Sequence, residues 1–223
     1  MQQQLNYPLR IFTLNYDLCV ESIAGDNFNV ETGFGDYGPQ NLWDYERFND
    51  SPTSGDPAPE IFLYKLHGSI NWKRDEQKRL YQVRQVQSVE SSSMELIFGR
   101  EFKLEAADPY LFYAYEFRRL TTGCRLIVTI GYGFADEHIN KLLSQALLLQ
   151  NGPNLVVFTM TGNIEESKQN ICQILEVKER ERITVQNITA RSLLELPDLG
   201  DKVASLIPSE LDPFTLQEDE GSE

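Results

Sequence analysis

Short apolar runs alternate along this chain with segments whose apolar residues recur at helical spacing. Apolar runs at residues 9–14, 61–66 and 154–160 predict buried strands. A run at 124–134 breaks into a Gly-Tyr-Gly turn, and residues 183–189 predict the last strand. Each run is short and rich in aliphatic or aromatic residues, which is typical of strands covered on both faces.

Four segments between these runs carry helix signals. The first begins near Asn15 and Asp17, both good capping residues, and ends at Gly25. The others cover residues 106–123, 135–150 and 164–182. Strands that alternate with helices predict an α/β protein, with a mostly parallel sheet and helices on both of its faces.

Some segments fall outside this alternation. Residues 25–60 are rich in Gly, Pro, Asp and Asn and hold six aromatic residues, so we expect this long loop to pack against the protein. Residues 79–89 alternate in places and predict a strand or one arm of a hairpin. We interpret residues 1–209 as a single domain, and 210–223, with six acids and no base, as an acidic disordered tail.

Composition narrows the classes of protein. Hydrophobic residues make up 41% of 223, and no apolar run is long enough to span a membrane or to serve as a secretion signal, so we expect a cytoplasmic protein without membrane contact. Three scattered cysteines favour reduced thiols. The net charge of −14 argues against direct binding of nucleic acid.

Unusual turns follow three of the predicted strands: "TLNYD" from residue 13, "LHGS" from residue 66 and "IGYGFADEH" from residue 130. Ligands of open α/β sheets bind beyond the carboxyl ends of the strands. Because parallel strands bring these ends to one edge, we expect the three turns to converge. His67, one of only two histidines, would then face a crevice.

Each turn also has a structural interpretation. A histidine beside an apolar strand is often a hydrogen-bonded structural residue, and Asn15 and Asp17 can be simple helix caps. Gly131 and Gly133 can serve only to form a tight turn, and "GYG" is weaker than a full dinucleotide-binding fingerprint. Taken singly, these residues leave both interpretations open.

The backbone amides of the third turn precede a helix that Asp136 opens, so they could approach a ribose or a phosphate. Asp136 itself would repel a phosphate placed too close.

Together, "TLNYD", "KLHGSINW" and "IGYGFADEHIN" resemble the sirtuin-like NAD-consuming domains, especially the bacterial branch associated with anti-phage defence. The resemblance spans about residues 9–160 and implies a Rossmann-like fold that uses NAD as its substrate. In that family the histidine of the second motif is catalytic, and the Asn and Asp of the first contact the nicotinamide ribose and carboxamide.

Carried over residue by residue, the resemblance makes His67, Asn15 and Asp17 the catalytic residues, with some contribution from Asp136. The cofactor-binding residues that it implies are Thr13, Asn15, Tyr16, Asp17, Gly131, Tyr132 and Gly133.

Two departures from the family pattern change the expectation. Three distant cysteines cannot supply the four-cysteine zinc module of the deacetylases, so we expect no zinc and favour NAD hydrolysis over deacylation. Only "MQQQLNYP" precedes the first strand, so the opening βα unit with its Gly-Ala-Gly loop is expected to be missing. We therefore expect this chain alone to bind NAD weakly and to hydrolyse it poorly.

The leading hypothesis is an NAD hydrolase that cleaves the nicotinamide–ribose bond and acts as an anti-phage defence effector. The first alternative is a non-catalytic sensor of NAD or ADP-ribose. The second is an assembly subunit, forming a homo-oligomer or docking a partner protein such as a motor ATPase.

Overall fold

The computed structural model describes residues 8–24, 27–49, 58–86, 90, 92, 94–96 and 108–208. The chain forms two compact units. Unit 1 comprises residues 1–120 with 136–138, and unit 2 comprises 121–135 with 139–223. The single domain over residues 1–209 stays a prediction, and the predicted tail at 210–223 lies outside the described residues.

The three-stranded sheet of unit 1 is parallel throughout and is centred on β3 (Ile61–Lys65). This strand lies between β1 (Leu9–Thr13) and β2 (Val30–Glu31). All five residues of β3 are buried. A parallel strand with neighbours on both edges and cover on both faces is expected to be apolar almost throughout, as the "IFLYKL" run predicted.

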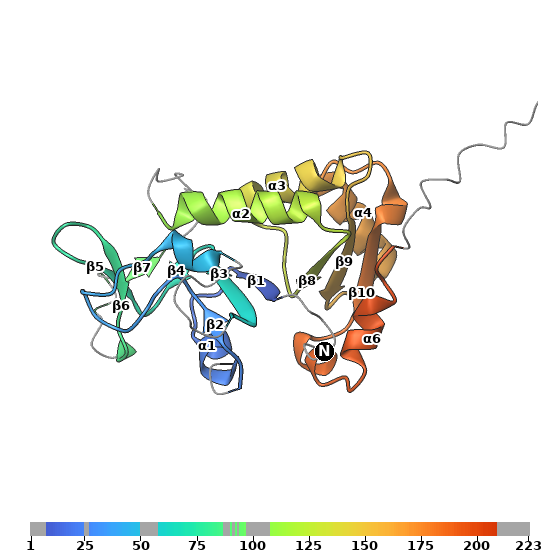
Figure 1. Cartoon of the computed structure of the whole chain (residues 1–223). Coiled ribbons are helices and arrows are strands. Elements are labelled where there is room, and N and C mark those ends of the chain that lie inside the picture. Colours follow the sequence, from blue (N-terminus) through green and yellow to red (C-terminus); the bar gives the residue numbers. More distant parts are fainter. Residues whose placement is uncertain are drawn as a thin grey trace, which may run out of the picture. The chain divides into compact units, whose positions relative to one another are not determined.

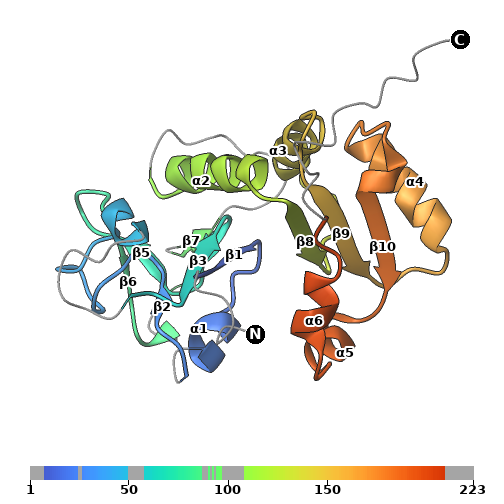
Figure 2. The same ribbon diagram turned by 45° about the vertical axis from the view of Figure 1, so that its right-hand side comes forward.

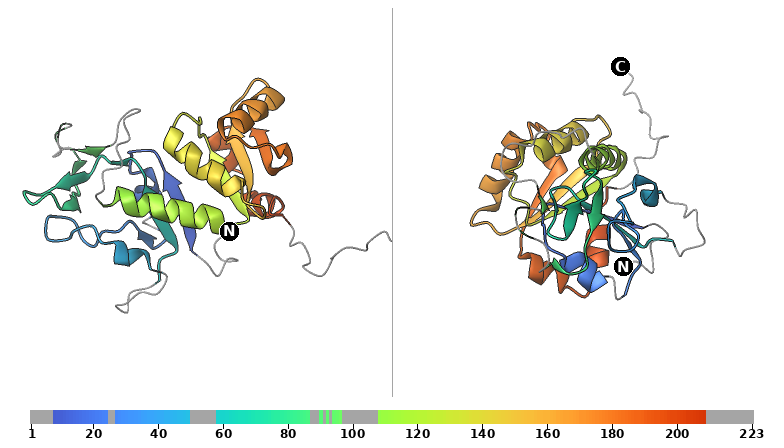
Figure 3. Two further views of the ribbon diagram at one scale, coloured as in Figure 1. Left: turned by 90° about the horizontal axis from the view of Figure 1, so that it is seen from above. Right: turned by 90° about the vertical axis from the view of Figure 1, so that its left-hand side faces the viewer.

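One face of this sheet packs against aromatic side chains of α2 (Tyr110–Gly123). The ring of Phe12 stacks on Tyr64 at 4.3 Å between centroids and meets the edge of Phe117 at 5.0 Å. Tyr113 meets Tyr64 edge-on at 5.7 Å. Figure 1 shows α2 above the sheet and α1 (Cys19–Ala24) below it, and α2 crosses over the strands in the left view of Figure 3.

The aromatic loop packs against this same core, as its composition predicted. Phe34 and Phe48 are buried, and Phe48 stacks on Tyr64 at 4.7 Å. Trp43 donates its indole N–H to the Tyr113 hydroxyl at 3.1 Å. The short 3-10 helix η2 (Tyr45–Phe48) carries Phe48 inward and leaves Tyr45 exposed.

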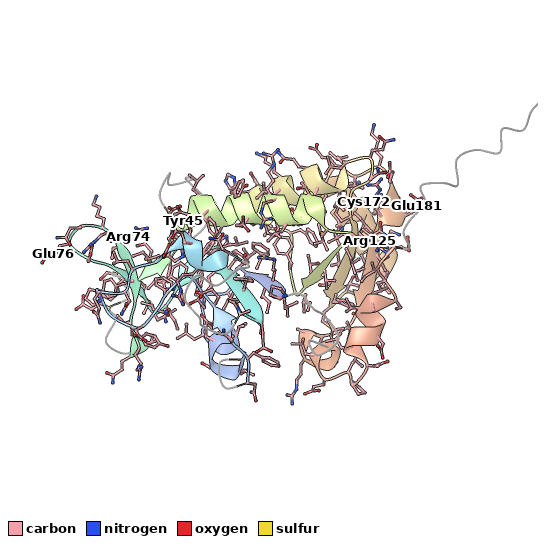
Figure 4. The ribbon with its side chains drawn as sticks, in the orientation of Figure 1. Tyr45, Arg74, Glu76, Arg125, Cys172 and Glu181 are labelled. Carbon is pink, nitrogen blue, oxygen red and sulfur yellow. The ribbon has the colours of Figure 1, made fainter. Side chains whose placement is uncertain are left out.

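Two small antiparallel sheets follow β3. Strand β4 (Gly68–Ser69) pairs with β7 (Glu95–Leu96), and β5 (Trp72–Arg74) pairs with β6 (Leu80–Gln82). Arg74 and Glu76 lie on the hairpin that β5 and β6 form (Figure 4). The strand expected within residues 79–89 is therefore confirmed as the second arm of a hairpin.

Unit 2 holds a second parallel sheet, in which β9 (Asn154–Thr159) lies between β8 (Leu126–Ile130) and β10 (Ile183–Asn187). Figure 2 shows these three strands side by side. Two helices run between them, α3 (Glu137–Leu147) and α4 (Ile164–Ile174). Right-handed crossovers place both helices on the same face of the sheet.

Successive residues of each strand point to opposite faces of this second sheet. Val156 and Phe158 pack with Leu193 of α5 (Ala190–Leu194), and α6 (Leu199–Ala204) joins this cluster through Leu199. Residues of the opposite parity are buried too: Ile127, Leu155, Val157, Ile183 and Val185. Cys172, also buried, lies on α4 (Figure 4). Helices on both faces of mostly parallel sheets confirm the predicted α/β, Rossmann-like class.

The predicted helices differ from the structure in their bounds, and two short helices were not predicted. Helix α4 ends at Ile174 rather than at residue 182, because Leu175 and Val177 turn inward to buried positions and Glu176 adopts a φ of +56°. Helix α1 begins only at Cys19. The short α5 and α6 had no clear sequence signal. No helix among the described residues is long and apolar enough to cross a membrane.

Candidate functional site

The carboxyl ends of β1 and β3 lie side by side in unit 1. Thr13 pairs with Lys65 at the last register position, and the Leu66 N–H donates to the Thr13 carbonyl at 3.0 Å. Beyond the strands, the Ile70 N–H donates to the Tyr16 carbonyl at 3.1 Å. The turn after β1 and the turn after β3 are thus held together by backbone hydrogen bonds, as parallel pairing predicts.

His67 lies in this turn, next to the first motif. Its ring centroid is 6.4 Å from that of Tyr16, and its side chain is 16% exposed. The imidazole is therefore neither fully solvated nor sealed within the core. A group in this position can exchange protons with a bound molecule while keeping a fixed orientation.

The backbone conformation and surroundings of residue 68 explain why a glycine follows His67. Its φ is +86°, and an added Cβ would lie 2.1 Å from the carbonyl oxygen of Glu95 on β7. Only glycine combines this backbone conformation with so close an approach. The turn that presents His67 therefore depends on the absence of a side chain at residue 68.

The hydrogen-bond partner of His67 is the carboxylate of Asp136, which lies in the segment just before α3. Asp136, which belongs to unit 1 with residues 136–138, places Oδ2 at 2.8 Å from His67 Nε2. Its other oxygen, Oδ1, accepts the His138 backbone N–H at 3.0 Å. The sequence placed Asp136 at the start of this helix and named it only as an unspecified contributor, because nothing in the spacing indicated which oxygen would face which group.

Asn15 and Asp17 occupy exposed positions in the turn after β1. Asp17 Oδ1 accepts the Cys19 backbone N–H at 2.9 Å, and this hydrogen bond holds the pKa of the Asp17 carboxyl below its usual range. Asp17 thus has the capping role that its sequence position suggested. An ionised carboxylate has about four acceptor sites, so one cap leaves it able to accept from a ligand.

Residues of the first motif, "TLNYD" from residue 13, also make hydrogen bonds within the turn and with the next turn. The Asn15 backbone N–H donates to the Thr13 hydroxyl at 3.1 Å, while the side chain of Asn15 extends from an exposed residue. The Tyr16 carbonyl is the acceptor for Ile70 already described. Thr13 and Tyr16 therefore shape the turn, in which Asn15 is an exposed residue.

Lys65 is a functional candidate that the sequence interpretation missed. The last residue of β3 is only 1% exposed, although it is a lysine. Its Nζ donates to the Asp17 carbonyl and lies 3.0 Å from Glu21 Oε1 on α1. The sequence feature that could have pointed to Lys65 is the presence of a lysine within the otherwise apolar run at residues 61–66. The ammonium joins the turn after β1, the first helix and the central strand.

The Gly-Tyr-Gly turn of the third motif lies in unit 2. Gly131 has a φ of +67° and donates its N–H to the Phe158 carbonyl at 2.9 Å. Asn140 is buried and accepts from the Tyr132 hydroxyl at 2.8 Å, while its own amide donates to the Phe134 carbonyl at 2.8 Å. The side chain of Asn140 therefore fixes the Gly-Tyr-Gly turn from within.

Both glycines of this turn border open space. A Cβ added to Gly131 or to Gly133 would meet no atom within 4 Å. This differs from Gly68, where the backbone of another strand occupies that space. The turn offers bare backbone to whatever approaches it.

A shallow pocket of about 310 Å³ lies elsewhere in unit 1, between η2 and α2. None of the predicted site residues lines it. Its lining residues are Tyr45, Phe48, Asn49, Phe112, Glu116 and Arg119. Because the charged residues Glu116 and Arg119 already pair with each other at 2.7 Å, the pocket presents little net charge to a ligand.

The cysteines are all free, and they differ in exposure. Cys19 is exposed, Cys124 is partly buried and Cys172 is buried. Within the described ranges, no group of three or more His, Cys, Asp and Glu side chains is arranged to hold a metal ion.

Comparison with known families now adds to this geometry. A family model described as a SIR2-like domain matches residues 9–183, most of the chain. The chain belongs to the SIR2-like family. A search of curated proteins found no match. The family resemblance expected from the three motifs is thereby confirmed at the level of the family, whose members use NAD. The individual residue roles stay predictions.

Proposed function

We propose that this SIR2-like chain hydrolyses NAD at the bond between nicotinamide and ribose. Breaking that bond develops positive charge on the sugar, as in glycoside hydrolysis. Nicotinamide leaves as a neutral molecule, so strong acid catalysis is not needed to expel it. The reaction gains instead from a base that deprotonates the incoming water and from groups that orient the ribose and the carboxamide.

The observation that carries this proposal is the position of His67. Its imidazole stands at the carboxyl end of the central strand of unit 1, partly exposed and beside the turn that holds Asn15 and Asp17. Histidine is the side chain best suited to accept a proton near neutral pH. We assign His67 as the general base on this ground.

The residues around His67 suit the remaining tasks. Asn15 is an exposed residue, and its side-chain amide can orient the water or a ribose hydroxyl. Asp17, ionised and with acceptor capacity beyond its cap, can accept from the carboxamide NH₂ of nicotinamide. Lys65 holds the backbone of this turn through the Asp17 carbonyl. These roles follow the family resemblance, and the geometry of unit 1 is compatible with each.

The Gly-Tyr-Gly turn is proposed to contact the adenosine portion of NAD. Support comes from the open space beside Gly131 and Gly133, where backbone atoms can approach a ligand without steric obstruction. The Tyr132 hydroxyl is engaged by Asn140, so its ring rather than its hydroxyl is the part offered to a ligand.

We further propose that the activity serves anti-phage defence, in which depletion of NAD stops growth of an infected cell. Motif resemblance to the bacterial defence branch supports this role. An oligomer or a partner such as a motor ATPase would then control when NAD is cleaved.

The decisive experiment measures free nicotinamide released from NAD by the full chain, purified with any partner that copurifies. We expect His67→Ala to lower the rate by about 10²–10⁴-fold, the usual contribution of a general base. The matched control is His138→Ala, which removes the other histidine. Undiminished release by the folded His67→Ala protein would exclude His67 as the base. NAD binding without any nicotinamide release, in the unsubstituted protein, would favour the sensor alternative.

A further inference from the structure

The contact between His67 and Asp136 bears on which ring nitrogen of His67 carries a proton. His67 Nε2 and Asp136 Oδ2 are 2.8 Å apart, and each side chain is 16% exposed. The pair is thus removed from most of the solvent. A charge-assisted hydrogen bond of this length in such surroundings is strong enough to orient a ring.

Asp136 is itself held in place. Its Oδ1 accepts the His138 backbone N–H in the first turn of α3, so the carboxylate uses one oxygen for the helix and the other for the imidazole. An aspartate that served only as a helix cap would have no need to direct its second oxygen at a histidine.

The hydrogen-bonding capacity of the Asp136 carboxylate then determines the tautomer of His67. An ionised carboxylate only accepts hydrogen bonds, so the proton between the two groups belongs to Nε2. In the neutral imidazole of His67, Nδ1 must therefore carry the lone pair. The nitrogen able to take up a proton is Nδ1.

We propose that Asp136 is a positioning residue that keeps His67 in its Nε2–H tautomer and makes Nδ1 the proton-accepting atom. This inference rests on the proposed function. During the reaction, Nδ1 takes a proton from water as the water oxygen bonds to the anomeric carbon. The bond to nicotinamide breaks with its electron pair remaining on the nicotinamide nitrogen. The imidazolium formed stays paired with the Asp136 carboxylate until its proton passes to solvent.

Asp136→Asn tests the assignment most directly. Asparagine can keep the helix cap with its single oxygen, and its NH₂ group then faces Nε2. An NH₂ donor demands a lone pair on Nε2 and shifts the proton to Nδ1, so the base is lost while the shape is kept. We expect kcat for NAD cleavage to fall at least 100-fold, with KM changed less than about threefold.

A second variant keeps the test valid if the first destabilises the fold. Asp136→Ser retains a good capping residue for α3 but is too short to reach the ring. It should leave thermal unfolding nearly unchanged and still lower kcat. Asp136→Glu, which restores a carboxylate, should recover part of the lost rate.

Nitrogen-15 NMR gives a readout that does not depend on activity, and only two histidines contribute signals. We expect the Nε2–H pattern for His67 in the unsubstituted protein and the Nδ1–H pattern in Asp136→Asn, with His138 unchanged. A Nδ1–H pattern in the unsubstituted protein, or no change in Asp136→Asn, would overturn the inference whatever the activity. The predicted tautomers without any NAD cleavage would instead refute the proposed function and leave the tautomer assignment standing.

Discussion

The two parallel sheets of this protein both have three strands, but different kinds of residue follow their central strands. In each, a central strand lies between two parallel neighbours, and its residues are largely buried. The central strand of unit 1 ends at Lys65, a buried charge, and is followed at once by His67. The central strand of unit 2 ends at the uncharged, partly exposed Thr159, beside the Gly-Tyr-Gly turn that follows β8.

This difference separates two ways of building a site on the same architecture. Unit 1 places titratable side chains at the carboxyl edge and secures them with ion pairs, such as that between Lys65 and Glu21. Unit 2 places backbone there and secures it with a neutral side chain, Asn140. The first arrangement suits proton transfer, and the second suits close approach of a ligand.

One effect expected within this comparison comes from the last residue of each central strand. Lys65→Met should lower the free energy of unfolding by about 2 kcal/mol, because Glu21 and the Asp17 carbonyl lose their common donor in a largely buried place. Thr159→Val, at the corresponding position of unit 2, should change it by less than about 0.5 kcal/mol. Urea unfolding measures both. A stabilised Lys65→Met protein would mean that burying the ammonium costs more than its contacts return.

A larger effect is expected at one of two positive-φ glycines that follow strands of the two units, Gly68 and Gly131. Gly68→Ala should cost about 3 kcal/mol, since the new methyl group meets the backbone of β7 in addition to the strain of a positive φ. Gly131→Ala should cost only about 1 kcal/mol, because the same strain arises in open space. Thermal unfolding compares them. Equal losses would show that the space beside Gly131 is not open in solution.

The smallest effect is a pH dependence in the aromatic core of unit 1. Burial raises the pKa of Tyr64 to about 12, against 10.0 for a free tyrosine. Because the folded pKa is the higher one, this contribution to stability is complete below about pH 10 and is lost as the pH rises from 10 to 12.

Tyr64→Phe tests this dependence. The variant should be about 1 kcal/mol less stable at neutral pH, since the hydrogen bond from Arg10 is lost, and the difference should shrink above pH 10. Tyr115→Phe, at an exposed position on the same unit, is the control. Chemical unfolding at pH 8, 10 and 11 gives the three points needed. A difference that is constant with pH would contradict the assignment.

Much of the fold could be predicted from local pattern. The apolar runs located β1, β3, β8, β9 and β10, and the helical spacing of Ile139, Leu143 and Leu147 located α3. The predicted end of a helix was wrong where burial of an apolar residue decides where the helix stops. Helix α4 stops at Ile174 because Leu175 is fully buried, and no local rule predicts which apolar residue the core will take up.

The candidate site was predictable only in its residue types. The motifs marked His67, Asn15, Asp17 and the glycines of the third turn, and the family model supports that reading of the chain as a whole. Lys65 was missed because a lysine in an apolar strand gives no indication of what it will meet. Its partners, Asp17 and Glu21, lie more than forty residues earlier in the chain.

By itself, the sequence determined the strands, most of the helices, the α/β class and the family, because these depend on periodicity and on motifs that are local. Only the tertiary structure decided that Asp136 and His67, 69 residues apart, share a hydrogen bond. It likewise decided that the glycine behind that histidine abuts another strand. The reason is physical: which atom of a side chain faces which neighbour depends on packing between segments distant in sequence, and the pattern along the chain does not contain those distances.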